Sequence, residues 1–241
     1  MKWEDLKVYR PLPKEELRQA FKPFTAAVAA HLAPYGFILL GRKLIRAVND
    51  VMQIIHIDTR GSWMGISATY ETGVAVIPYC SDFFRLTSSS ELLWQKPIEE
   101  IVPGIKNHYR ITAEYVLLAE YLAGRIIRDV LPYFNSINTS AQILSHWEDL
   151  LPKRRLFPGE AFAYDIVLLY CSLKNNKPDA AIPLLSALRQ HLEGKSGNRA
   201  EKLGNELDEY RQLVEQDDWK AIHEKLLAAE QLELRKCKLK L

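Results

Sequence analysis

Three runs of alternating apolar residues follow one another between Phe37 and Pro78, and they constrain the fold more than any other feature of the sequence. The dipeptides Asn49-Asp50 and Gly61-Ser62 separate the runs, and dipeptides of this kind form tight turns between antiparallel strands. A further short apolar run, Val74–Ile77, ends at Pro78, which cannot donate a ladder hydrogen bond. We therefore predict an antiparallel β-meander of about four strands.

The two turns also predict the register of the meander. With Asn49-Asp50 as the first turn, Val48 lies opposite Val51, Arg46 opposite Gln53 and Leu44 opposite Ile55. With Gly61-Ser62 as the second turn, Ile57 lies opposite Ile66. A slip of one residue would turn every side chain to the other face, so an all-apolar face supports the register. The predicted core face consists of Leu44, Val48, Val51, Ile55, Ile57, Met64, Ile66 and Ala68.

Helical periodicity dominates the rest of the chain. A stripe from Leu17 to Leu32 predicts a helix over 14–35 that covers the core face of the meander, and Gly36 suits a left-handed helix end. The fold class is therefore α+β: the meander is backed by this N-terminal helix and followed by a helical C-terminal region. We divide the chain into an α+β domain at 1–155 and a helical region at 156–241, which either stands apart or packs on the first domain. Further helices are predicted over 112–133, from 138–140 onward, and over 159–173, 178–192, 198–215 and 219–236.

The helices over 159–173 and 178–192 could form an αα-hairpin like those of helical repeat proteins. Their spacing does not match the tetratricopeptide pattern well, and no second copy is evident in the sequence. A repeat array is therefore not the architecture that we predict.

Composition excludes several classes of protein. The chain of 241 residues has 32 basic and 30 acidic residues, and a net charge of +2 gives no overall attraction to nucleic acid or to anionic membranes. No apolar run approaches the roughly 20 residues that span a bilayer, and the charged N-terminus lacks a signal-peptide core. Three widely spaced cysteines do not indicate a disulfide framework. We expect a cytoplasmic protein with reduced thiols.

Known catalytic motifs are missing from the sequence. The histidines lack the i, i+3 or i+4 spacing to another histidine or cysteine that helical metal sites favour. No G-x-S-x-G sequence occurs, and Gly194-Lys195-Ser196-Gly197 lacks the upstream glycine of a P-loop. We expect no catalytic residue, no cofactor and no metal.

Five polar or aromatic residues share the face of the meander opposite the predicted core: His56, Asp58, Arg60, Trp63 and Glu71. Trp and Arg are frequent anchors of protein interfaces, so these residues are our candidate binding site. Two other interpretations stay open. His56 could join Asp58 or Glu71 in acid–base catalysis, or later helices could cover this face and leave the charges solvated at its rim.

The segment Phe24–Pro78 resembles a family of bacterial proteins that is catalogued as a domain of unknown function. The resemblance rests on Leu32 to Gly36-Phe37, on the basic strand Gly41–Arg46, on Val51–Ile57 and on the glycine-started strand that follows. It implies a small α+β domain and no particular activity. Some neighbouring small α+β families look like immunity proteins for toxins, which is an analogy of fold alone.

The functional hypothesis is a protein-interaction module without catalysis, with an immunity or antitoxin-like binder as its sharpest form. A protein partner is expected, and neither a membrane nor a nucleic acid is. One alternative is an enzyme of unrecognised class that uses His56 and a carboxylate. The other is a nucleic-acid-binding module built on two basic clusters, Lys153-Arg154-Arg155 and the chain end from Arg235 to Lys240.

Overall fold

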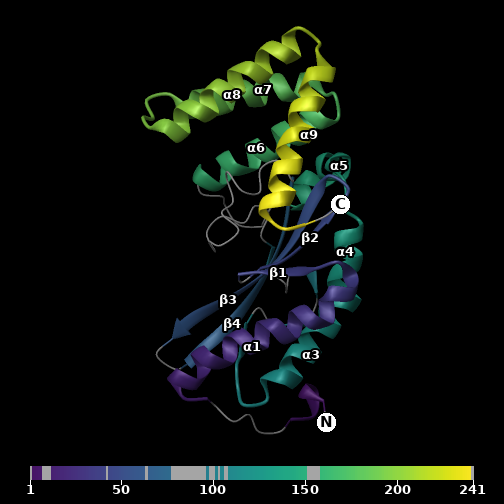
Figure 1. Cartoon of the computed structure of the whole chain (residues 1–241), viewed down its shortest axis with the longest axis vertical. Helices are drawn as coiled ribbons and strands as arrows, with labels where there is room; N and C mark the ends of the chain where they lie inside the picture. Colours follow the sequence, from purple (N-terminus) through teal and green to yellow (C-terminus); the bar gives the residue numbers. More distant parts are fainter. Residues whose placement is uncertain are drawn as a thin grey trace.

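The computed structural model of the chain describes residues 2–6, 12–41, 43–62, 65–76, 96–97, 101–102, 104–105, 108–150 and 158–239. Within these ranges the fold is α+β: one antiparallel sheet, helices packed along it, and a stack of helices at the C-terminal end (Figure 1). Residues 79–90, for which the sequence predicts a loop after the meander, lie outside the described residues.

Three long strands form the body of the sheet, and three short ones extend it. The strand order is β1-β2-β3-β4-β5, and β6 also pairs with β4, so the described sheet has six strands rather than about four. The predicted fourth strand at Val74–Ile77 is wrong as a separate element, because Val74 to Val76 continue β4. The strands are β1 (Ile38–Leu40), β2 (Lys43–Val48), β3 (Val51–Ser62), β4 (Gly65–Val76), β5 (Lys96–Pro97) and β6 (His108–Arg110).

The first predicted turn is confirmed and the second is wrong. Asn49 adopts the left-handed conformation that a tight hairpin turn requires, at φ 51°, and Val48 pairs with Val51 as predicted. At the second turn Ser62 pairs with Gly65, so Ile57 faces Tyr70 instead of Ile66. The strands continue through Gly61-Ser62, because a glycine inside a strand does not by itself end the ladder. The shift is an even number of residues, so each strand keeps its predicted faces.

The predicted core face is buried where the structure describes its side chains. Leu44, Val51, Ile55 and Ile57 are fully buried, and Val48 is half-buried. Met64 lies outside the described residues, as do the side chains of Ile66 and Ala68. The opposite face is not open along its whole length, because Ile45, Met52 and Ile54 are also buried.

Helix α1 (Lys14–Leu32) does not back the sheet alone, which corrects the prediction. Phe24, Val28 and Leu32 enter the same core as Leu44 and Ile55, but α1 packs more extensively on α3 (Tyr115–Arg125) than on any strand. The helical path of α3 continues through a π-helical segment, η5 (Ile126–Val130), into α4 (Leu131–Asn135). A short η2 (Ala33–Tyr35) ends at Gly36, whose φ of 84° confirms the predicted left-handed end. A further short helix, η1 (Trp3–Asp5), lies near the N-terminus.

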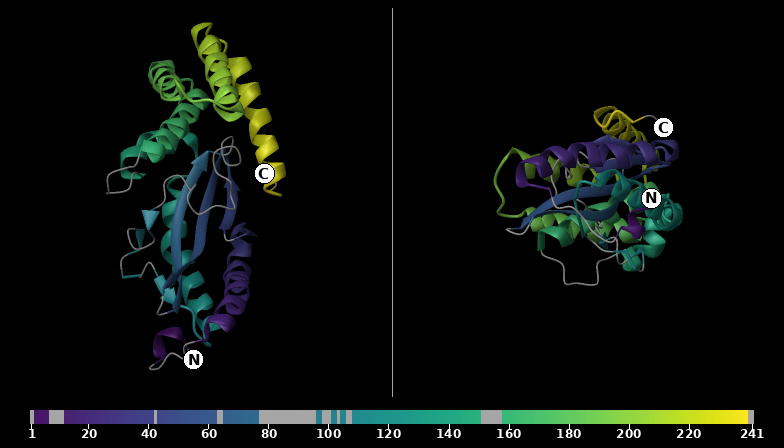
Figure 2. Two further views of the ribbon diagram at one scale, coloured as in Figure 1. Left: turned by 90° about the vertical axis from the view of Figure 1, so that its left-hand side faces the viewer. Right: turned by 90° about the horizontal axis from the view of Figure 1, so that it is seen from below.

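The C-terminal helices match the predicted ranges closely. They are α5 (Ser140–Leu150), α6 (Pro158–Lys174), α7 (Pro178–Leu192), α8 (Asn198–Glu215) and α9 (Trp219–Lys236). Helices α6 to α8 stack beyond one end of the sheet, whereas α9 runs back toward the sheet and brings the C-terminus beside it (Figures 1 and 2). In the described part of the chain, each helix is too short or too polar to cross a membrane.

The hairpins α6–α7 and α8–α9 are two copies of one local structure, although no second copy is evident in the sequence. Asn176 and Asp217, 41 positions apart, both adopt a left-handed conformation, at φ 52° and 55°. The backbone hydrogen bonds around them repeat: the amide of Asn176 donates to Leu173 as Asp217 donates to Val214. The amide of Lys177 donates to Ser172 as that of Asp218 donates to Leu213.

Burial repeats at the same spacing as the turn. Leu173 and Val214 are buried just before the two turns, and Leu185 and Leu226 are buried on the helices that follow. Repetition of both hydrogen bonding and burial indicates one supersecondary unit used twice.

Candidate functional site

The five predicted binding residues lie on or beside the β3–β4 hairpin. The register pairs His56 with Glu71, Asp58 with Thr69 and Arg60 with Ser67. Because the second turn is displaced from its predicted place, His56 and Glu71 are direct cross-strand neighbours, which the predicted register did not give. Trp63 lies outside the described residues, as do the side chains of the other four.

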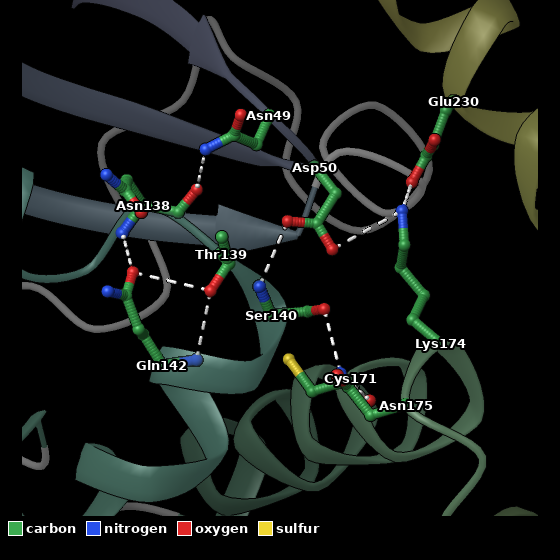
Figure 3. A network of polar contacts seen from close by, with 10 residues as sticks. All are labelled: Asn49, Asp50, Asn138, Thr139, Ser140, Gln142, Cys171, Lys174, Asn175 and Glu230. Carbon is green, nitrogen blue, oxygen red and sulfur yellow. Dashed lines mark hydrogen bonds and ion pairs between the residues drawn. The ribbon is translucent and has the colours of Figure 1, made fainter.

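A different polar cluster forms where the β2–β3 turn meets the helical end of the molecule (Figure 3). We call this cluster the junction; it consists of Asn49, Asp50, Asn138, Thr139, Ser140, Gln142, Cys171, Lys174, Asn175 and Glu230. Its members come from the β2–β3 turn, from the start of α5, from the end of α6 and from α9. The junction therefore joins four segments that are far apart in the sequence.

The start of α5 supplies one side of the junction. Thr139 Oγ1 accepts a hydrogen bond from the amide of Gln142 at 3.2 Å, and Gln142 Oε1 accepts from the amide of Asn138 at 2.8 Å. This reciprocal pattern resembles a capping box, and it confirms the predicted helix start at 138–140. The β2–β3 turn adds to it, because Asp50 Oδ1 accepts from the amide of Ser140 at 3.0 Å. Asn49 Nδ2 donates to the carbonyl of Asn138 at 3.0 Å.

Lys174 is the centre of charge in the junction. Its ammonium lies 3.5 Å from Asp50 Oδ2 and forms a short ion pair with Glu230 Oε1. All three side chains are largely buried, so the cation is shared by two carboxylates that water solvates poorly. Burial lowers the pKa of Lys174, while the charge and hydrogen bond of Asp50 act to raise it.

Asn175 ties α6 to α5. Its Nδ2 donates to Ser140 Oγ at 2.9 Å and to the carbonyl of Cys171 at 2.8 Å. The Cys171 thiol is fully buried beside these groups, and burial raises its pKa well above the ordinary value. A thiol in this environment stays protonated and unreactive.

A second seam connects the sheet to the end of α4. Gln53 is fully buried, and its Nε2 donates to the carbonyls of Phe134 and Ile137 at 2.7 and 3.2 Å. Its Oε1 accepts from Arg46 Nε at 2.6 Å, which confirms the predicted pairing of these two residues. Arg46 also donates to Asn135 Oδ1 at 3.1 Å, and burial lowers its pKa. The amide side chain thus satisfies the carbonyls at a helix end.

The chemistry of the junction is that of a connector. Its donors and acceptors engage one another across segments, and within the described residues no three His, Cys, Asp or Glu side chains converge as metal ligands. Of the basic clusters, 153–155 lies outside the described residues. At the chain end Lys236 pairs with Glu233 at 3.0 Å, and Arg235 and Lys238 are exposed.

Sequence reasoning missed the junction for a clear reason. Asp50 was predicted as a turn residue, and Lys174 and Glu230 stood in helices with no sequence signal that would pair them. Their meeting depends on the packing of α9 against α6, which is a long-range property. The one hint in the sequence is that Glu230 and Glu233 continue the helical spacing of Ile222 and Leu226 on α9.

No family model, curated protein or solved structure matches this chain. The resemblance of Phe24–Pro78 to a domain of unknown function therefore stays a prediction.

Proposed function

We propose that the chain is a protein-interaction module, as immunity and antitoxin-like binders are, and that it contacts its partner through the β3–β4 hairpin. The register of this hairpin is the observation that carries the proposal. It pairs His56 with Glu71, Asp58 with Thr69 and Arg60 with Ser67, within one continuous antiparallel ladder of two strands of 12 residues each. Charged and aromatic side chains arranged along such a ladder form a compact recognition surface.

The position of the hairpin supports this proposal. The β2–β3 turn is fixed at the junction, while the strands run away from it toward the start of α1 (Figure 1). Asp58 and Arg60 therefore lie toward the end of the hairpin that is far from the helical stack. A recognition surface on strands anchored at one end is held in place better than one on a loop.

The test compares tagged parent protein with a triple variant, Asp58→Ala, Arg60→Ala and Trp63→Ala, in capture from host lysate followed by mass spectrometry. A matched control changes three exposed residues of α9 instead: Lys220→Ala, Glu224→Ala and Gln231→Ala. We expect a specific partner with the parent and the control that is lost with the triple variant, while circular dichroism shows all three folded. Equal capture by the parent and the folded triple variant would move the contact off the hairpin and refute this site.

A second candidate function rests on the pairing of His56 with Glu71. A histidine opposite a carboxylate is the minimal arrangement for acid–base catalysis. This hypothesis predicts a raised His56 pKa that drops in Glu71→Gln, measured by NMR titration. An unchanged His56 pKa in Glu71→Gln would remove the candidate.

A further inference from the structure

Helix α9 changes character halfway along its length. In its first half Ile222 and Leu226 are buried in the main core, as Ala181 and Leu185 are on α7. In its second half it buries two carboxylates, Glu230 at 6% and Glu233 at 2% exposure. Buried carboxylates oppose docking unless cations neutralise them. Docking of the second half of α9 therefore depends on cations beside these two side chains. Lys174 supplies that charge to Glu230, and Lys236 to Glu233.

The end of α9 covers an apolar patch of the sheet. Leu234 and Cys237 form a cluster with Ile45, Met52 and Ile54 of β2 and β3, and Leu239 packs against it. This cluster is small and separate from the main core. A helix end held by so small a cluster can open at a lower free energy than the whole fold.

The first hairpin, α6–α7, is closed at its open end by a ring contact that the second hairpin, α8–α9, lacks. At the open end of α6–α7, the rings of Phe162 and His191 stack with centroids 4.3 Å apart. The residues at the same places in α8–α9 are Leu203 and Leu232, and Leu232 is 50% exposed. Helices α8 and α9 also pack on each other much less than α6 and α7 do. Helix α9 therefore packs on α8 and on α6 to a similar extent, and its end reaches the sheet.

We propose that residues 229–239, which are the second half of α9 and the three residues after it, form a releasable strap on the sheet. The ion pair of Lys174 with Glu230 holds the strap docked, and Asp50 contacts the same ammonium from the β2–β3 turn. When it is released, the strap uncovers Ile45, Met52 and Ile54, and α9 is free to close on α8 as α7 closes on α6. This inference concerns access to the sheet and does not depend on the proposed partner.

The two buried cysteines allow a direct test in the full-length chain. Cys237 lies in the strap and Cys171 lies in α6. Both are buried, and neither forms a disulfide. In a Cys80→Ser background, labelling by N-ethylmaleimide is followed by mass spectrometry. The labelling rate of each cysteine is divided by its rate in the chain unfolded by urea, which corrects for differences in thiol reactivity. We expect Cys237 to label at least tenfold faster than Cys171, because strap release exposes only Cys237. If the normalised rates of the two cysteines are equal and rise equally with urea concentration, both thiols are exposed only by global unfolding, and the proposal is overturned.

Charge variants test the latch itself. We expect Lys174→Met to raise the Cys237 rate about tenfold relative to the parent, with a smaller effect on Cys171. In the double variant Lys174→Met with Glu230→Gln, the Cys237 rate should fall part of the way back to the parent rate, because no unpaired carboxylate remains at position 230. Lys225→Met is the matched control: Lys225 pairs with Glu209 of α8 and should leave the Cys237 rate within twofold of the parent. If Lys174→Met labels Cys237 no faster than Lys225→Met does, the latch is refuted.

Discussion

The two C-terminal hairpins share a turn and differ in how they close. Around Asn176 and Asp217 the backbone repeats its dihedral angles and its hydrogen bonds. Beyond the turns, α7 packs along α6. Helix α9 packs less on α8, and its end contacts the junction and the sheet. The turn depends on residues near it in sequence, whereas the path of the second helix depends on distant partners. The comparison therefore separates a local determinant of structure from a long-range one.

The largest expected difference comes from the buried leucines of the two second helices. We expect Leu185→Ala to lower the free energy of unfolding by about 3–4 kcal/mol and Leu226→Ala by about 2–3 kcal/mol. Both side chains are buried, but Leu185 lies on a helix packed along α6 and α8, so its cavity can relax less. Urea unfolding of the two variants measures this. A larger loss for Leu226→Ala would contradict the looser closure of the second hairpin.

Asn175 and Gln216 occupy the same place before the two turns, but only Asn175 belongs to the junction. We expect Asn175→Ala to cost about 1–2 kcal/mol, because Ser140 and the Cys171 carbonyl lose a buried donor. Gln216→Ala should cost less than about 0.5 kcal/mol, since its side chain is exposed. Equal effects in thermal unfolding would show that the turn needs an amide side chain at this place, independent of the junction.

The helix starts after the two turns differ in their caps. Asp218 accepts from the amide of Ala221 at 3.0 Å, whereas Lys177, at the same place before α7, has no side-chain acceptor. We expect Asp218→Ala to cost about 1 kcal/mol and Lys177→Asp to gain up to about 1 kcal/mol. Chemical denaturation measures the change in the free energy of unfolding of both variants. A destabilising Lys177→Asp would mean that the equivalence of the two turns does not extend to their caps.

The sequence predicts elements with a strong local signal and fails where contacts between distant residues decide. Asn49-Asp50 gave a correct turn and register, and Gly36 and Asn138 marked true helix boundaries. Gly61-Ser62 carried the same kind of signal, yet the ladder continues through it. The repeat was missed because its evidence is conformational, in that Asn176 and Asp217 share a backbone conformation without sharing an amino acid.

The candidate binding site is a different case. Placing His56 opposite Glu71 required the true register of the second turn, which the dipeptide signal misplaced. Two parts of the junction, the Asn49-Asp50 turn and the helix start at 138–140, were predicted. Its central ion pairs were not, because the sequence near Lys174 does not identify Asp50 or Glu230 as partners.

The smallest expected effect concerns pH and distinguishes the open ends of the two hairpins. Burial and the nearby charge of Lys195 lower the pKa of His191, while the nearby charge of Asp165 opposes this. The unfolded chain therefore takes up the proton first as the pH falls. The neutral, partly buried imidazole of His191 thus stabilises the hairpin at neutral pH, and this contribution is lost below about pH 6.5. Asp165 acts with the opposite sign and at lower pH, because burial raises its pKa. Leu232, at the place of His191 in the second hairpin, does not titrate.

Amide hydrogen exchange measured between pH 7 and pH 5, and corrected for its intrinsic pH dependence, tests this. As the pH falls, the end of α7 should lose protection while the end of α9 does not. His191→Leu should make the two helices respond alike, and a profile for α7 that stays flat in the parent would contradict the role of His191.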